Sequence, residues 1–222
     1  MRFLDREQAG RLLAERLGAL RAERPIVLGL TRGGVPVAFE VARLLEAPLE
    51  MVVVRKLGAP GAPEATVGAI AEGGETFINP TVLREASLAA ETAARIAEEQ
   101  VEELTRRVRL YRHGRAPPHV AGRTVVVVDD GVATGASVRA AARGLRRRGA
   151  TRVVLAAPVV SASVEPDLRR DFDEVIALEA PAHVDAIRDW YERFPEVTDQ
   201  DVVACLARAE AELRAGLAIG WT

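Results

Sequence analysis

Two adjacent aspartates and a turn of small residues are the strongest chemical signal in the sequence. Asp129 and Asp130 follow a run of four valines, and the segment 131–137 after them reads GVATGAS. A helix that begins in such a turn presents backbone N–H groups and a positive dipole, which bind phosphate. The carboxylates would repel a phosphate, but they accept hydrogen bonds from sugar hydroxyls or hold Mg²⁺ through water. The segment therefore predicts a ligand with a phosphate at one end and a vicinal diol at the other, such as ribose 5-phosphate.

Alternative motifs fit this segment less well. A Walker A loop needs a lysine in G-x-x-x-x-G-K-[ST], and a Rossmann fingerprint needs G-x-G-x-x-G with an acidic residue about 20 residues later. A paired aspartate at a strand end also occurs in receiver-like phospho-acceptor domains, but this interpretation leaves the ATGAS turn without a role. A purely structural role, in which Asp129 and Asp130 cap the next helix, uses two carboxylates where one is enough.

The lone lysine is a second candidate. The chain has 29 arginines and one lysine, Lys56. Ammonium and guanidinium differ in size and donor geometry, so a lysine in so arginine-rich a chain marks a position that arginine does not serve. Lys56 follows Arg55 at the end of an apolar run and precedes a Gly/Pro-rich stretch, residues 57–66. Its position supports a functional role over drift at a random surface site.

Five short apolar segments must position these residues. They alternate with helical patterns and consist almost entirely of Val, Ile and Leu, which is typical of parallel strands covered on both faces. The predicted strands are residues 26–30, 49–54, 124–128, 152–157 and 174–178. The predicted fold class is α/β, a doubly wound, mostly parallel five-stranded sheet with helices on both faces. Ligands bind beyond the carboxyl ends of such strands, where the candidate residues lie.

The remaining segments predict helices and a hairpin. Amphipathic patterns predict helices over 5–22, 35–46, 81–112 and 163–171, one after the ATGAS turn, and a last one starting at a Thr198–Asp201 capping box. Residues 57–66 predict a loop, and the flanks of Gly73–Gly74 predict a β-hairpin. The predicted domains are a core over 1–180, with a mobile loop and hairpin at 55–79, and a C-terminal helical hood over 181–222.

Composition narrows the class of protein. The formal net charge is −2 and 49% of the residues are hydrophobic, which excludes disorder and gives no support for nucleic-acid or membrane binding. The single cysteine, Cys205, excludes a disulfide within the chain, and the N-terminal residues lack the apolar core of a signal peptide. We expect a cytoplasmic protein with neither a nucleic-acid nor a membrane partner.

Three motifs together resemble the type I phosphoribosyltransferases. The strand, the Asp-Asp pair and the ATGAS turn are similar to the signature with which this family binds 5-phosphoribosyl-1-pyrophosphate (PRPP). GLTRGG (29–34) resembles the family's pyrophosphate-binding loop, and RKLGAPG (55–61) resembles the opening of the mobile active-site loop in adenine phosphoribosyltransferases. The motifs stand in the family's order and span residues 26–148. The C-terminal quarter matches none of these motifs and lies where the family carries a base-recognising hood.

The resemblance implies a role for each motif. Asp129 and Asp130 would hold the ribose hydroxyls and help to place Mg²⁺, the expected cofactor. The 5′-phosphate would be held by Gly131, Ala133, Thr134, Gly135, Ala136 and Ser137. The pyrophosphate would be held by Thr31, Arg32 and Gly33, although Arg32 also suits a structural salt bridge. Arg55 and Lys56 would be catalytic, with the two aspartates, by stabilising the departing pyrophosphate.

The implied activity is Mg-dependent transfer of the phosphoribosyl group to a nucleobase or similar nitrogen acceptor in purine or pyrimidine salvage, by a homodimer. Trp190 and Tyr191 are candidates for stacking on the base, and packing of the hood on the core is an equal alternative for them. Ala133 stands where 6-oxopurine enzymes usually have Asp, which argues against hypoxanthine and guanine. A regulatory protein that binds PRPP without catalysis is the alternative function. The presence of Lys56 and the Gly/Pro-rich stretch favours the enzyme.

Overall fold

The five predicted strands form one parallel sheet. The computed structural model describes residues 2–219. The strands are β1 (Ile26–Leu30), β2 (Leu49–Val52), β6 (Thr124–Val128), β7 (Arg152–Val159) and β8 (Glu174–Glu179). They are hydrogen-bonded in the order β2-β1-β6-β7-β8, and every pair is parallel. The strand order reverses between β1 and β6, which makes the gap between their carboxyl ends the switch point where ligands bind in such sheets.

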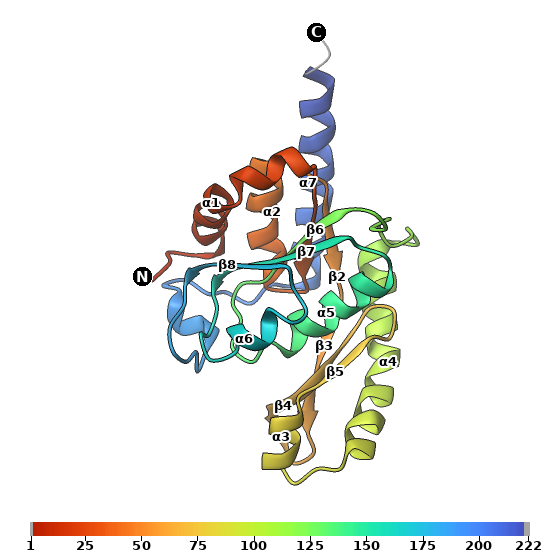
Figure 1. Cartoon of the computed structure of the whole chain (residues 1–222). Coiled ribbons are helices and arrows are strands. Elements are labelled where there is room, and N and C mark those ends of the chain that lie inside the picture. The colour runs from red at the N-terminus through yellow and green to blue at the C-terminus, as the bar shows by residue number, and fades with distance from the viewer. Residues whose placement is uncertain (1, 220–222) are drawn as a thin grey trace.

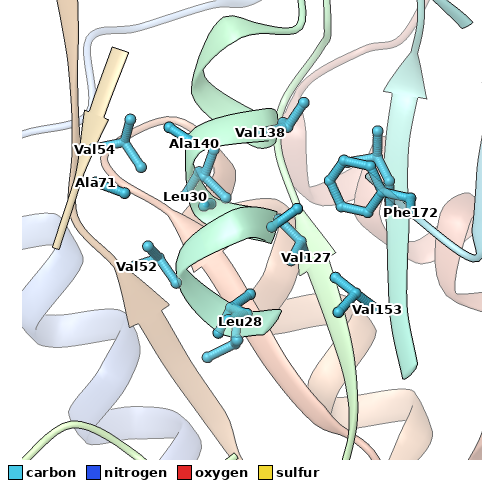
Figure 2. Packing of buried hydrophobic residues seen from close by; sticks show 14 of the residues in the cluster. Leu28, Leu30, Val52, Val54, Ala71, Val127, Val138, Ala140, Val153 and Phe172 are labelled. Atoms are coloured by element: carbon cyan, nitrogen blue, oxygen red, sulfur yellow. The ribbon is translucent and has the colours of Figure 1, made fainter. Parts of the chain in front are cut away.

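Helices cover both faces of this sheet, as the strand composition predicts (Figure 1). Side chains alternate along a strand, so Val126 and Val128 of β6 pack with α1 (Arg6–Arg16) and α2 (Gly34–Leu45). Val125 and Val127 face the opposite way, toward α5 (Ala136–Arg147). Figure 2 shows this second layer, in which residues of α5 lie over β1, β6 and β7. A buried scaffold of this kind holds the strand ends, and therefore the candidate residues, in fixed positions.

A second sheet projects from the first and forms an arm with its own helices (Figure 1). Its strands are β3 (Val54–Ala59), β4 (Ala62–Ala71) and β5 (Thr76–Ile78), which are antiparallel in the order β3-β4-β5. The predicted hairpin at Gly73–Gly74 is confirmed, and both glycines have positive φ values of 95° and 85°. The arm also carries α3 (Pro80–Glu85) and α4 (Ala90–Arg112), which replace the single helix predicted over 81–112.

The prediction of a loop at residues 57–66 is wrong for most of that segment. The chain continues β3 to Ala59, turns, and returns as β4 from Ala62. Leu57 and Ala59 are buried at 0% and 5% exposure in the apolar cluster shared with α4, and this alternation favours a strand over a loop. Gly61 supplies the turn with a φ of 76°.

The remaining helices lie in the N-terminal part of the chain and after β7. The predicted helix over 5–22 is α1 followed by a 3-10 helix, η1 (Gly18–Glu23), and the short helix is α6 (Glu165–Leu168). The C-terminal part contains η2 (Ile187–Trp190) and α7 (Asp199–Ile219). The capping box at the start of α7 is confirmed, since the Asp201 N–H donates to Thr198 Oγ1 at 3.1 Å and the Thr198 N–H donates to Asp201 Oδ2 at 2.8 Å. Within residues 2–219, no helix has the length and apolar character that crossing a membrane requires.

Candidate active site

A cleft of about 750 Å³ lies beyond the carboxyl ends of β1 and β6. Its wall contains Arg32, Gly33, Lys56 and Asp130, which come from the three separate sequence motifs. The remaining wall is contributed by the two ends of the chain. These residues are Arg2, Arg6, Ile187, Arg188, Asp189, Tyr191, Glu192, Phe194, Pro195, Glu196 and Val197. The fold thus brings together residues that are far apart in the sequence, at the predicted edge of the sheet.

The two aspartates form a crowded acidic pair at the end of β6. Asp129 Oδ1 accepts a hydrogen bond from the Asp130 N–H at 2.9 Å. Burial, and after it the charge of Asp130, raises the pKa of Asp129 well above its ordinary value, while Lys56 and Arg6 act in the opposite direction. A carboxyl pair with this much unfavourable charge is stabilised by a cation or by hydroxyl donors.

The loop after β1 is pressed against this pair. A Cβ on Gly33 would lie 2.0 Å from Asp130 Oδ2, and a Cβ on Gly34 would lie 2.5 Å from the Val128 carbonyl oxygen. Only glycine permits this approach. Thr31 has a buried Oγ1 that has no hydrogen-bond partner among the described residues, and the Thr31–Arg32 peptide is cis. The predicted pyrophosphate loop therefore lies directly beside the predicted ribose and metal site.

The ATGAS turn begins α5 as predicted. Gly135 precedes the helix with a φ of 75°, and no described side chain caps the first helical turn. Thr134 is exposed and Ser137 is half-buried. Helix-start N–H groups without a side-chain acceptor are available to an anion. Gly131 at the other end of the turn packs on Ile187, since a Cβ there would lie 2.6 Å from Ile187 Cδ1. This contact ties the turn to the C-terminal segment.

Arg55 and Lys56 point to opposite faces of β3. Lys56 is exposed and lines the cleft. Arg55 donates to Gln100 Oε1 of α4 at 2.6 Å and lies 3.9 Å from Glu103 Oε1. Burial lowers the pKa of the Arg55 guanidinium. Because neighbouring side chains alternate along a strand, only one of the two can reach the cleft. In this structure Arg55 joins the arm to α4 and is not part of the cleft wall beside Lys56, so a catalytic role for Arg55 stays a prediction without support from its position.

The predicted aromatic platform is not formed by Tyr191. Its side chain is 1% exposed and packs against Phe3 and Phe194, with ring centroids 5.6 Å and 4.9 Å away. The Tyr191 hydroxyl donates to the Asp130 carbonyl at 2.6 Å. Tyr191 therefore supports the backbone at Asp130. This position agrees with packing of the C-terminal segment on the core, the alternative to base stacking. Trp190 is half-buried and lines a neighbouring hollow with Arg2 and His183 instead of the cleft.

Arg6 is a site residue that the sequence analysis missed. Its Nε and Nη2 atoms each lie 2.9 Å from Asp130 Oδ2, and Nη1 donates to the Pro195 carbonyl at 2.7 Å. Its guanidinium also lies 3.7 Å from the centroid of the Phe194 ring. Arg6 stands on the buried face of α1 with Ala9 and Leu13. The sequence did contain a signal for it. Arg6 stands at helical spacing from the apolar Ala9 and Leu13, which indicates a buried arginine.

The two aspartates suit Mg²⁺ that is shared with a ligand. In the described part of the chain, no group of three or more His, Cys, Asp or Glu side chains is arranged to hold a metal ion. Mg²⁺ commonly uses one or two carboxylates and completes its octahedron with water and substrate phosphate oxygens. The pair of Asp129 and Asp130 meets that requirement, and a bound cation would offset the burial and the neighbouring charge that raise the pKa of Asp129.

An uncapped helix start, a carboxylate pair and a glycine loop thus meet at the switch point of a parallel sheet. The family model described as "Phosphoribosyl transferase domain" matches residues 4–186. The chain belongs to this family. It is 48% identical to TT1426 from Thermus thermophilus, whose crystal structure superposes with a TM-score of 0.77, and the match covers 94% of this chain and 99% of that one.

Two curated relatives are also similar over most of the chain. They are Mycobacterium tuberculosis proteins from strains CDC 1551 and H37Rv, provisionally named phosphoribosyl transferases, and each is 45% identical over 210 residues. The match covers 95% of this chain and 47% of each relative. The chain therefore spans about half the length of the curated relatives it matches.

Proposed function

We propose that this chain binds PRPP with Mg²⁺ and transfers the phosphoribosyl group to a nitrogen acceptor, with release of pyrophosphate. One observation carries the proposal: Arg32, Lys56 and Asp130, from three separate motifs, line a single cleft beside the uncapped start of α5. The family membership supports the same activity.

The donor would lie along the switch point. Its 5′-phosphate would accept hydrogen bonds from the N–H groups at the start of α5, with Thr134 and Ser137 adding hydroxyl donors. Its ribose hydroxyls would donate to Asp129 and Asp130. Its pyrophosphate would extend over Thr31–Gly33, toward Arg32 and Lys56. This proposed arrangement follows the order of the groups in PRPP.

In the reaction, the bond from the anomeric carbon to pyrophosphate breaks and a bond from that carbon to the acceptor nitrogen forms. Negative charge grows on the pyrophosphate as it leaves, and preorganised cations stabilise such charge. Bound Mg²⁺ would neutralise pyrophosphate oxygens. Lys56 lines the cleft from the arm strand β3, and its positive charge would act on the departing pyrophosphate. The chain needs no nucleophile of its own.

The acceptor would enter from the side of the C-terminal segment. On this wall Ile187, Phe194 and Val197 supply apolar side chains among charged ones such as Arg188 and Asp189. This mixture suits a heterocycle that also carries polar groups. Ala133 still argues against hypoxanthine and guanine. We propose a nucleobase or similar nitrogen heterocycle as the acceptor, and a cytoplasmic homodimer acting in nucleotide salvage.

A screen of nucleobases with PRPP and Mg²⁺, in which released pyrophosphate is measured, tests this function. The proposal expects release that depends on one acceptor and is abolished by Asp130→Asn. Saturable PRPP binding without release with any acceptor would support the alternative, a regulatory protein that senses PRPP. Release that persists unchanged in Asp130→Asn would show that the reaction occurs elsewhere.

A further inference from the structure

The cation on the pyrophosphate side of the cleft is already paired with the protein's own carboxylate. Arg32 Nη2 lies 2.6 Å from Glu196 Oε1, and Arg32 Nη1 lies 3.8 Å from Asp199 Oδ1. The Glu196 side chain is 77% exposed, whereas the Arg32 side chain is 30% exposed. An exposed pair of this kind contributes little net stability because water and salt screen it. A ligand with several negative charges can therefore replace Glu196 at small cost.

The two carboxylates around Arg32 are held differently. Asp199 begins α7, and its Oδ1 accepts a hydrogen bond from the Tyr111 hydroxyl of α4 at 2.6 Å. Glu196 has no such support, and Arg32 is its only hydrogen-bond or ion-pair partner among the described side chains. Displacement by a ligand should consequently move Glu196 and leave Asp199 in place.

Glu196 belongs to a segment that is tied to the donor site at a second point. The neighbouring Pro195 carbonyl accepts a hydrogen bond from Arg6, which also binds Asp130. Two consecutive residues of the C-terminal segment are thus linked to the predicted pyrophosphate loop and to the predicted ribose site. In the free protein this segment lies across the donor side of the cleft through charge and hydrogen bonding.

We infer that Glu196 is an internal competitor that occupies Arg32 until pyrophosphate replaces it, and that it thereby lowers the affinity of the chain for pyrophosphate. The inference rests on the proposed function, because it requires a pyrophosphate subsite at Arg32. Glu196 competes with every ligand for this guanidinium, so it weakens the binding of anions in general. A polyanion that spans Arg32 and Lys56 regains this loss through its additional contact, and a ligand without a pyrophosphate does not. After reaction, the return of Glu196 to Arg32 favours release of pyrophosphate.

Calorimetric titration of the full chain with inorganic pyrophosphate tests this inference. Glu196→Gln keeps the size of the side chain and removes its charge. We expect the variant to bind pyrophosphate about two- to fivefold more tightly than the wild type, the range that an exposed ion pair allows. Glu192→Gln is the matched control, since Glu192 lines the same cleft and forms no ion pair with a described side chain. Its affinity should stay within about 1.5-fold of the wild type, because an unpaired exposed charge is screened.

Repeating the titration in a variant that lacks Arg32 separates competition for this guanidinium from a general effect of removing one negative charge. In Arg32→Gln, the further change Glu196→Gln should no longer tighten binding, because the group for which Glu196 competes is gone. Equal affinities of Glu196→Gln and Glu192→Gln, or the same tightening in the Arg32→Gln background, would overturn the inference. Melting curves of the free variants check that each one is folded.

The outcome for the wild type separates this inference from the proposed function. If the wild type binds PRPP but the pyrophosphate affinities of the variants do not differ, the inference fails and the proposed function stands. If the wild type binds neither PRPP nor pyrophosphate, both fail.

Discussion

Arg6→Ala should destabilise the free protein far more than an arginine change at the surface. The Arg6 side chain is 10% exposed and its partner Asp130 is 14% exposed, so the pair is largely removed from water. The substitution deletes both contacts to Asp130 Oδ2, the hydrogen bond to the Pro195 carbonyl and the contact with the Phe194 ring. It also leaves the Asp130 carboxylate without its counterion beside Asp129.

The magnitude follows from this burial. Removing one partner of a buried ion pair costs about 3–5 kcal/mol, and the remaining exposure of the pair favours the lower end, about 3 kcal/mol. For a domain of this size each kcal/mol lowers Tm by about 2–4 °C, so we expect a fall of about 6–12 °C. Urea denaturation of the free protein gives the free energy of unfolding directly, and the midpoint should fall without a change in slope.

Arg193→Ala is the matched control for this experiment. Arg193 Nη2 lies 2.7 Å from Asp5 Oδ2, so it joins the same two parts of the chain, but the Arg193 side chain is 64% exposed. Its removal should cost no more than about 1 kcal/mol. In the double variant Arg6→Ala/Asp130→Asn, removal of the stranded charge should recover part of the lost stability, so the two single effects should not add. An Arg6→Ala variant as stable as Arg193→Ala would refute the view that Arg6 is the counterion of Asp130.

Three further outcomes are expected. Lys56→Ala should lower kcat about 10²-fold in steady-state kinetics, while PRPP affinity falls much less. Lys56→Arg should recover little of the lost kcat, and a fully active Lys56→Arg would refute the argument from the lone lysine. Arg55→Ala should change kcat by less than about threefold although it lowers Tm, since Arg55 contacts α4 and not the cleft; a loss as large as that of Lys56→Ala would return Arg55 to the active site. Gly33→Ala should leave a folded protein that binds PRPP poorly, because its Cβ would collide with Asp130 Oδ2 at 2.0 Å; unchanged affinity in a thermal-shift titration would contradict this geometry.

The scaffold was predictable because its signals are local. Each of the five strands is a short, mainly apolar run, buried along β1, β6 and β7 and partly buried in β2 and β8. The Gly73–Gly74 turn and the Thr198–Asp201 capping box each depend on residues that are neighbours in the sequence. The acidic pair and the ATGAS turn were predictable for the same reason, since one continuous segment contains a strand end, two carboxylates and a helix start.

The misses concern contacts that only the tertiary structure determines. Arg6 reaches Asp130 across 124 residues, and no local pattern predicts that pairing. Arg55 contacts α4 and Lys56 lines the cleft because side chains alternate along β3. This alternation could not be predicted, because the Gly/Pro content of residues 57–66 indicated a loop where β3 continues past Lys56. Tyr191 was chosen because it forms an adjacent aromatic pair with Trp190, and nothing in the sequence indicated that Phe3 and Phe194 enclose its ring in the folded chain.

Direct titration of the wild-type chain with PRPP tests the central claim. The account predicts saturable binding at one site per chain that strengthens when Mg²⁺ is added and is lost in the double variant Asp129→Asn/Asp130→Asn while the fold persists. At a hundredfold excess over Kd, the ligand should stabilise the protein by about 2.7 kcal/mol, with a smaller effect from ATP or NAD. The absence of any binding or stabilisation with millimolar PRPP and Mg²⁺, or normal PRPP binding in the double variant, would contradict the account.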